Sequence, residues 1–140
     1  MNTGTRILII EDSSDDQELL MRQLRKAQLD RQVKVISNGK VALEFLMDKD
    51  SSHEDLVAIF LDLKLPLVSG LELLEKIRQS TDKRTRNIPV IIMTSSNAPA
   101  DLEKCQQLRV SSYVQKPITF SAFAKAVAKS FHTVSETASV

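Results

Sequence analysis

In the stretch Ile59-Phe60-Leu61-Asp62-Leu63-Lys64-Leu65-Pro66, a run of apolar side chains ends at a carboxylate. Residues 57–61 are apolar and rich in β-branched and aromatic types, which predicts a strand buried on both faces, as in parallel sheets. Asp62 stands where the run ends, and Pro66 prevents the strand from continuing. Open α/β sheets bind ligands at the carboxyl ends of their strands, so Asp62 is a candidate site residue, although a single Asp at such a place often only caps a turn.

Length and composition indicate one globular domain. The chain has 140 residues, of which 42% are hydrophobic and 26% charged, and its formal net charge of +1 gives no bulk attraction to nucleic acid or to an anionic membrane. No apolar run approaches the ~20 residues of a spanning helix, and the polar N-terminus shows no signal peptide. The single cysteine, Cys105, cannot form an internal disulfide, which fits a reducing compartment. We therefore expect a cytoplasmic protein, with Cys105 as a half-buried helix residue.

Short apolar segments alternate with helical patterns along the chain. The predicted strands lie near 7–10, 33–36, 57–61, 90–93 and 112–115, and the predicted helices begin near 14, 41, 70, 97 and 120. This alternation predicts an α/β fold, a doubly wound five-stranded parallel sheet with five helices, which is the flavodoxin-like arrangement. We expect one domain over 1–132 and a flexible C-terminal tail over 133–140, with surface loops at 48–55 and 79–87.

Polar side chains follow the predicted strands at the points where the strands end. The carboxyl ends of parallel strands share one edge of the sheet, so these residues can converge although they are far apart in sequence. Buried charges need partners, which makes such residues poor core material, whereas carboxylate oxygens suit Mg²⁺. The sequence therefore predicts a metal and phosphoryl site made of Glu11, Asp12, Asp62, Thr94 and Lys116.

This arrangement resembles the receiver domain of two-component response regulators, over about residues 6–131. The resemblance depends on four motifs that occur in order, each at a predicted strand end: Ile7-Leu8-Ile9-Ile10-Glu11-Asp12; Phe60-Leu61-Asp62-Leu63-Lys64-Leu65-Pro66 with Gly70; Met93-Thr94-Ser95; and Tyr113-Val114-Gln115-Lys116-Pro117. The loops at 48–55 and 81–87 are similar to those of stand-alone receivers, including receivers paired with bacterial phytochromes.

The resemblance implies a role for each charged residue. Asp62 would accept a phosphoryl group from a phosphohistidine of a sensor histidine kinase or a phosphotransfer protein. Asp12, Asp62 and the backbone carbonyl of Lys64 would ligate Mg²⁺, while Glu11 would act through water. Lys116 would pair with Asp62 and then with the phosphoryl oxygens. The metal would offset the repulsion between the incoming phosphoryl group and the carboxylates.

The resemblance also implies a switch. Thr94 would donate its hydroxyl to a phosphoryl oxygen, and Tyr113 would change rotamer as the loop after Thr94 moves; a helix cap and ordinary packing are the competing interpretations. The bond between Lys116 and Pro117 is expected to be cis. The signal would be read on a surface formed by the helix near 97–108, the strand at 112–115 and the last helix, and a homodimer could form across the same surface.

Two other classes of function compete with this interpretation. A small Mg²⁺-dependent phosphohydrolase would use Asp62 as nucleophile, but it usually carries a second acid where this chain has Lys64. A flavodoxin-like nucleotide carrier needs a phosphate-binding loop where Glu11 and Asp12 would repel phosphate. We expect a single-domain response regulator that binds no DNA and no membrane, catalyses only its own phosphorylation and dephosphorylation, and acts on an unknown protein target.

Overall fold

One parallel sheet of five strands forms the centre of the molecule. The computed structural model describes residues 5–48, 56–95 and 99–138, with side chains in the last helix as far as Ser130. The strands lie in the order β2-β1-β3-β4-β5, which places β3 in the middle of the sheet. Their bounds are β1 (Ile7–Ile10), β2 (Val33–Ile36), β3 (Ala58–Asp62), β4 (Val90–Thr94) and β5 (Ser112–Gln115).

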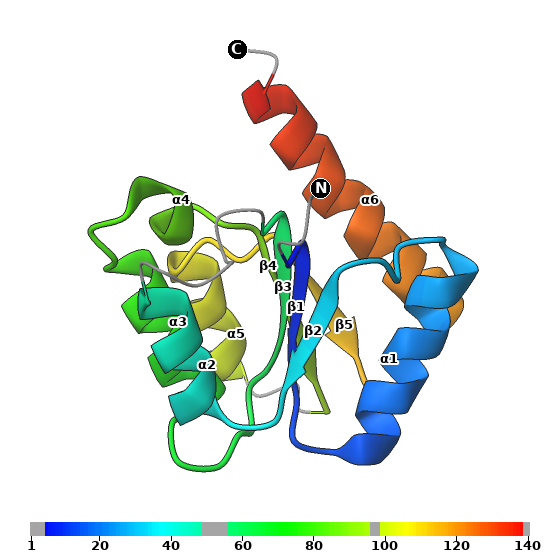
Figure 1. Cartoon of the computed structure of the whole chain (residues 1–140), viewed down its shortest axis with the longest axis horizontal. Helices are drawn as coiled ribbons and strands as arrows, with labels where there is room; N and C mark the ends of the chain where they lie inside the picture. Colours follow the sequence, from blue (N-terminus) through cyan, green and yellow to red (C-terminus); the bar gives the residue numbers. More distant parts are fainter. Residues whose placement is uncertain (1–4, 49–55, 96–98, 139–140) are drawn as a thin grey trace.

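Helices cover both faces of this sheet, which confirms the predicted doubly wound fold. One layer contains α2, α3 and α5, and the opposite layer contains α1 and α6 (Figure 1). The helices are α1 (Ser14–Lys26), α2 (Gly39–Met47), α3 (Gly70–Arg78), α4 (Lys83–Arg86), α5 (Pro99–Gln107) and α6 (Phe120–Ala138). None of those in the described part of the chain combines the length and the hydrophobicity that crossing a membrane requires.

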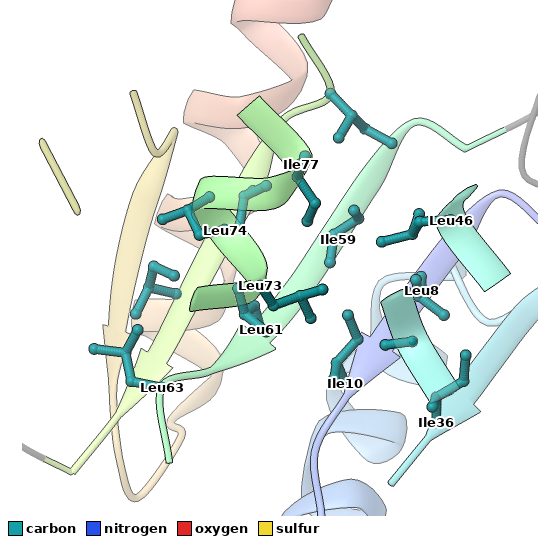
Figure 2. Packing of buried hydrophobic residues seen from close by; sticks show 14 of the residues in the cluster. Leu8, Ile10, Ile36, Leu46, Ile59, Leu61, Leu63, Leu73, Leu74 and Ile77 are labelled. Carbon is teal, nitrogen blue, oxygen red and sulfur yellow. The ribbon is translucent and has the colours of Figure 1, made fainter. Parts of the chain in front are cut away.

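The two helical layers give the molecule two apolar clusters, one on each face of the sheet. Side chains alternate along a strand, so Leu8 and Ile10 of β1 pack in one cluster while Ile7 and Ile9 pack in the other. Figure 2 shows the first cluster, in which leucines and isoleucines of β1 and β3 lie against those of α2 and α3. The continuous apolar runs that the sequence shows are thus explained by burial on both faces.

The short helix α4 is a difference from the predicted fold. The segment 79–87 was expected to be a loop, but Asp82 caps a helix from Lys83 to Arg86, with its carboxylate accepting from the backbone N–H of Arg84 at 2.9 Å. Four residues are too few to show a helical apolar period, so the described part of the chain has six helices where five were predicted. Most of the other predicted loop, 48–55, lies outside the described residues.

Two further predictions compare differently with the structure. Cys105 is fully buried rather than half-buried, and burial, with a smaller contribution from Asp101, raises the pKa of its thiol to about 11. Helix α6 runs to Ala138, so the helix continues past residue 132, where the sequence suggests the end of the domain. The boundary between the domain and the tail over 133–140 stays a prediction.

Candidate phosphoryl and metal site

The acidic cluster forms where β1 and β3 end side by side. The two strands pair in parallel, with Ile10 opposite Leu61, so the next residue of each strand reaches the same edge of the sheet. Glu11, Asp12 and Asp62 there each offer one carboxylate oxygen, and these oxygens all lie within 4.8 Å of one another. The structure therefore brings together three acidic residues that are up to 51 positions apart in sequence.

Burial differs among the three acids. Glu11 is inaccessible and Asp62 is 5% exposed, whereas Asp12 lies at the surface. Burial raises the pKa of Glu11 to about 7; the hydrogen bond from Lys116 acts in the opposite direction, and the neighbouring Asp62 raises the pKa further. Without a cation beside it, this cluster is an unfavourable concentration of negative charge.

Lys116 supplies one positive charge to the cluster. Its ammonium Nζ lies 2.6 Å from Glu11 Oε1, 2.9 Å from Asp16 Oδ2 and 3.3 Å from Asp62 Oδ2. Burial lowers the pKa of Lys116, but the hydrogen bonds to Glu11 and Asp16 outweigh this effect and leave the pKa above its ordinary value. The ammonium thus forms ion pairs with three carboxylates, and among them it donates hydrogen bonds to Asp16 and Asp62.

Asp16 is the site residue that the sequence did not single out. It lies in the first turn of α1, where an acid is favourable simply because of the helix dipole. The spacing of Ser13 and Asp16 also fits a capping box, in which the acid would accept from the N–H of the cap. In the structure that N–H instead donates to Glu11 Oε2 at 3.1 Å, which leaves the Asp16 carboxylate to Lys116.

The chain leaves Asp62 through a closely packed turn. The backbone N–H of Lys64 donates to Asp62 Oδ1 at 3.1 Å, so this carboxylate is oriented from its own loop. The N–H of Gly70, the first residue of α3, donates to the carbonyl oxygen of Leu63 at 3.0 Å. A β-carbon at Gly70 would clash with the carbonyl oxygen of Asp62, so glycine is required where α3 starts against the end of β3.

Thr94 and Tyr113 lie on the neighbouring strands β4 and β5. Thr94 is buried, and its carbonyl oxygen accepts from the backbone N–H of Lys116 at 2.8 Å, which links the strand end to the charge cluster. The half-buried Tyr113 donates its hydroxyl to the carbonyl oxygen of Leu102 on α5 at 3.0 Å. Both residues line a cavity of about 530 Å³ between β4, β5 and α5. The peptide bond between Lys116 and Pro117 is cis, which confirms that prediction.

Comparison with known proteins agrees with this geometry. The family model described as the response regulator receiver domain matches residues 7–128. The probable methanogenesis regulatory protein FilR2 of Methanothrix harundinacea is 33% identical over 122 residues, which cover 86% of this chain and 77% of FilR2.

Solved structures lead to the same family. The bacteriophytochrome response regulator RtBRR is 38% identical with a TM-score of 0.77, over 90% of this chain and 77% of that one. The Mn²⁺-bound form of the response regulator Rcp1 is 28% identical with a TM-score of 0.72, over 87% of this chain and 88% of that one. Both similarities extend over at least 87% of this chain.

Proposed function

Since this chain belongs to the family of response regulator receiver domains of two-component signalling, we propose that it is a single-domain response regulator phosphorylated on Asp62. The observation that carries the proposal is the position of Asp62, a nearly buried carboxylate at the end of the central strand, beside two other acids and within 3.3 Å of a lysine ammonium. The phosphoryl donor is a phosphohistidine of a sensor histidine kinase or of a phosphotransfer protein.

The transfer proceeds by attack of an Asp62 oxygen on phosphorus. A P–O bond forms, the P–N bond to the donor's imidazole breaks, and the imidazole leaves with the electron pair of that bond. The carboxylate charge of Asp62 disappears into an acyl phosphate, while the phosphoryl oxygens bring new negative charge to the same place. Lys116 compensates this charge by donating to phosphoryl oxygens in place of its longest contact, the one to Asp62.

The acidic cluster fits a hard divalent cation such as Mg²⁺. Its donor oxygens lie close enough for one ion, and Mg²⁺ prefers carboxylate and carbonyl oxygens with several retained waters. Asp12, Asp62 and the backbone carbonyl of Lys64 would bind the ion directly, and Glu11 would bind it through water. When bound, the ion neutralises charge on the transferring phosphoryl group.

The switch connects this site to a partner-binding surface made of α5, β5 and α6. Thr94 donates its hydroxyl to a phosphoryl oxygen, and Tyr113 then repacks beside α5. The cavity that both residues line supports this route, because it leaves room for the Tyr113 ring to change its packing. The output is contact with a downstream protein or with a second copy of the chain across this surface.

Labelling with a small phosphodonor tests the proposed function. Wild-type protein incubated with acetyl phosphate and Mg²⁺ should gain one phosphoryl group by intact mass spectrometry, and Asp62→Asn should gain none while keeping its circular dichroism spectrum. Label that persists on another residue would overturn the site assignment. Repeated turnover of an aryl phosphate, with no stable label, would favour a phosphohydrolase instead.

A further inference from the structure

Of the three carboxylates around Lys116, two belong to the acidic cluster and one does not. Glu11 and Asp62 belong to the group of acids that could hold an ion, but Asp16 does not. Asp16 Oδ2 lies 2.9 Å from the ammonium, and its side chain is 28% exposed. Among the described contacts of this side chain, the one to Lys116 is what connects Asp16 with the site.

The first turn of α1 holds Asp16 in place. The Ser13 hydroxyl accepts from the backbone N–H of Asp16 at 3.3 Å, and the N–H of Ser13 donates to Glu11 Oε2 at 3.1 Å. The side chain of Gln17 donates to the carbonyl oxygen of Glu11 at 2.6 Å. Two side chain–backbone hydrogen bonds thus join the start of the helix to the end of β1, so the Asp16 carboxylate is presented to Lys116 from a rigid element.

We propose that Asp16 is a positioning residue that, together with Glu11, holds the Lys116 ammonium in place when Asp62 becomes an acyl phosphate. This inference rests on the proposed function. In the unmodified protein Lys116 has a third anchor, Asp62, but that contact is the longest, at 3.3 Å. When the P–O bond forms, the donor leaves with the electron pair and Asp62 loses its carboxylate charge, so this anchor is lost in the step in which Lys116 is needed.

The physical reason for a second anchor is the flexibility of lysine. Its ammonium is carried on a four-carbon stem with free rotation, so one ion pair leaves it several orientations. Two carboxylates, one at the end of β1 and one on α1, restrict the ammonium to the place where the phosphoryl oxygens arrive. A donor that is already in position stabilises the developing charge without reorganisation.

Substitution at Asp16, with a matched control at Asp15, tests this role. Asp15 lies in the same helical turn, is exposed, and its side chain makes no hydrogen bond or ion pair within the described part of the chain. Asp15→Asn therefore removes the same charge without touching Lys116. Acetyl phosphate at saturating Mg²⁺ is the phosphodonor, so neither kinase docking nor metal affinity limits the rate.

Asp16→Ala should phosphorylate about tenfold more slowly than wild type, because a misplaced catalytic donor costs rate steeply. The phosphorylation rate of Asp16→Asn should lie between those of Asp16→Ala and wild type, because its amide oxygen still accepts a hydrogen bond. The rate of Asp15→Asn should match wild type. If Asp16 only repelled the anionic donor, Asp16→Ala would react faster. An unchanged or faster rate in Asp16→Ala overturns the inference.

A spectroscopic measurement reads the contact itself. Hydrogen-bonded ammonium protons exchange slowly with water, so the ¹⁵Nζ–¹H signal of Lys116 should be visible in unphosphorylated wild type and in Asp15→Asn, and should be lost in Asp16→Ala. A signal that is unchanged in Asp16→Ala overturns the positioning role. Wild type that takes up no phosphoryl group would overturn the proposed function, whereas equal uptake by wild type and Asp16→Ala would overturn only the role of Asp16.

Discussion

Lys116 and Arg78 are two shielded cations whose partners differ in kind. Lys116 lies at the carboxyl edge of the sheet and contacts three carboxylates. Arg78, the last residue of α3, lies near the amino ends of β4 and β5 and donates to neutral carbonyl oxygens. Its Nε and Nη2 reach Leu108 and Arg109 at 2.7 and 3.1 Å, and Nη1 reaches Arg86 and Ile88 at 3.1 and 2.7 Å.

The pKa values of the two cations move in opposite directions. Burial, with a smaller contribution from the charge of Arg109, lowers the pKa of Arg78 to about 10, because carbonyl oxygens do not replace the lost hydration fully. Burial also acts to lower the pKa of Lys116, yet the carboxylates more than reverse it. Arg78 therefore joins α3 to α4 and to the turn before β5, whereas Lys116 can exchange one anion for another. The chemistry of the partners, rather than burial, separates a structural cation from a reactive one.

Removal of Lys116 should have the largest effect on the chemistry. Lys116→Met should slow phosphorylation by acetyl phosphate by about 100-fold or more, because a preorganised donor to the phosphoryl group is lost. The rate of label uptake, followed by mass spectrometry, is the measurement. Lys104→Met is the matched control, because Lys104 of α5 pairs with Glu75 of α3 and not with an acid of the cluster, so its removal should leave the rate unchanged. A rate for Lys116→Met close to that of wild type would contradict the role of Lys116 as the reactive cation.

Removal of Arg78 should affect stability and leave the chemistry intact. Arg78→Met keeps the apolar stem but leaves four carbonyl oxygens without this donor, which should lower the free energy of unfolding by about 3 kcal/mol. Urea unfolding measures the loss, and Arg22→Met on the exposed face of α1 serves as the control. Phosphorylation of the folded variant should proceed at the wild-type rate. If Arg78→Met also lost phosphorylation, the surroundings of Arg78 would affect the phosphoryl site, and the contrast between the two cations would be wrong.

The acidic edge should also make stability depend on pH. The folded pKa of Glu11, about 7, lies above its ordinary value of 4.5, so the folded state holds a proton that the unfolded state releases. The associated stability is present below pH 4.5 and is lost as pH rises through 7. In metal-free buffer the free energy of unfolding should therefore fall by about 3 kcal/mol across this window.

Urea unfolding of wild type and Glu11→Gln in the presence of a chelator checks this dependence. The variant should show a flatter profile, because its side chain does not titrate. Titration of Arg78 does not change the free energy of unfolding in this window, since its guanidinium stays protonated up to about pH 10. A stability that rises with pH in the wild type, or equal slopes in the two proteins, would contradict the assignment to Glu11.

Much of the fold and the core of the site could be read from local patterns. The apolar runs predicted the parallel strands because burial on both faces leaves no polar alternation, and the residues after each run predicted the edge at which Glu11, Asp12, Asp62 and Lys116 converge. Helix α4 was missed because four residues carry no period, and only the cap at Asp82 marks it.

The sequence by itself determined that the polar residues at the strand ends meet at one edge of the sheet. Parallel strands place their carboxyl ends at the same edge, whatever the loops do. The sequence motifs indicated that Lys116 would pair with Asp62, but tertiary structure alone decided the partners that no motif indicates. Asp16 meets Lys116 across 100 residues because Glu11 occupies the N–H that a capping box would have used. Arg78 finds its carbonyl oxygens 8 to 31 residues away, on segments whose approach no local pattern encodes. Electrostatic partners depend on distances between elements, and these distances exist only once the helices are packed on the sheet.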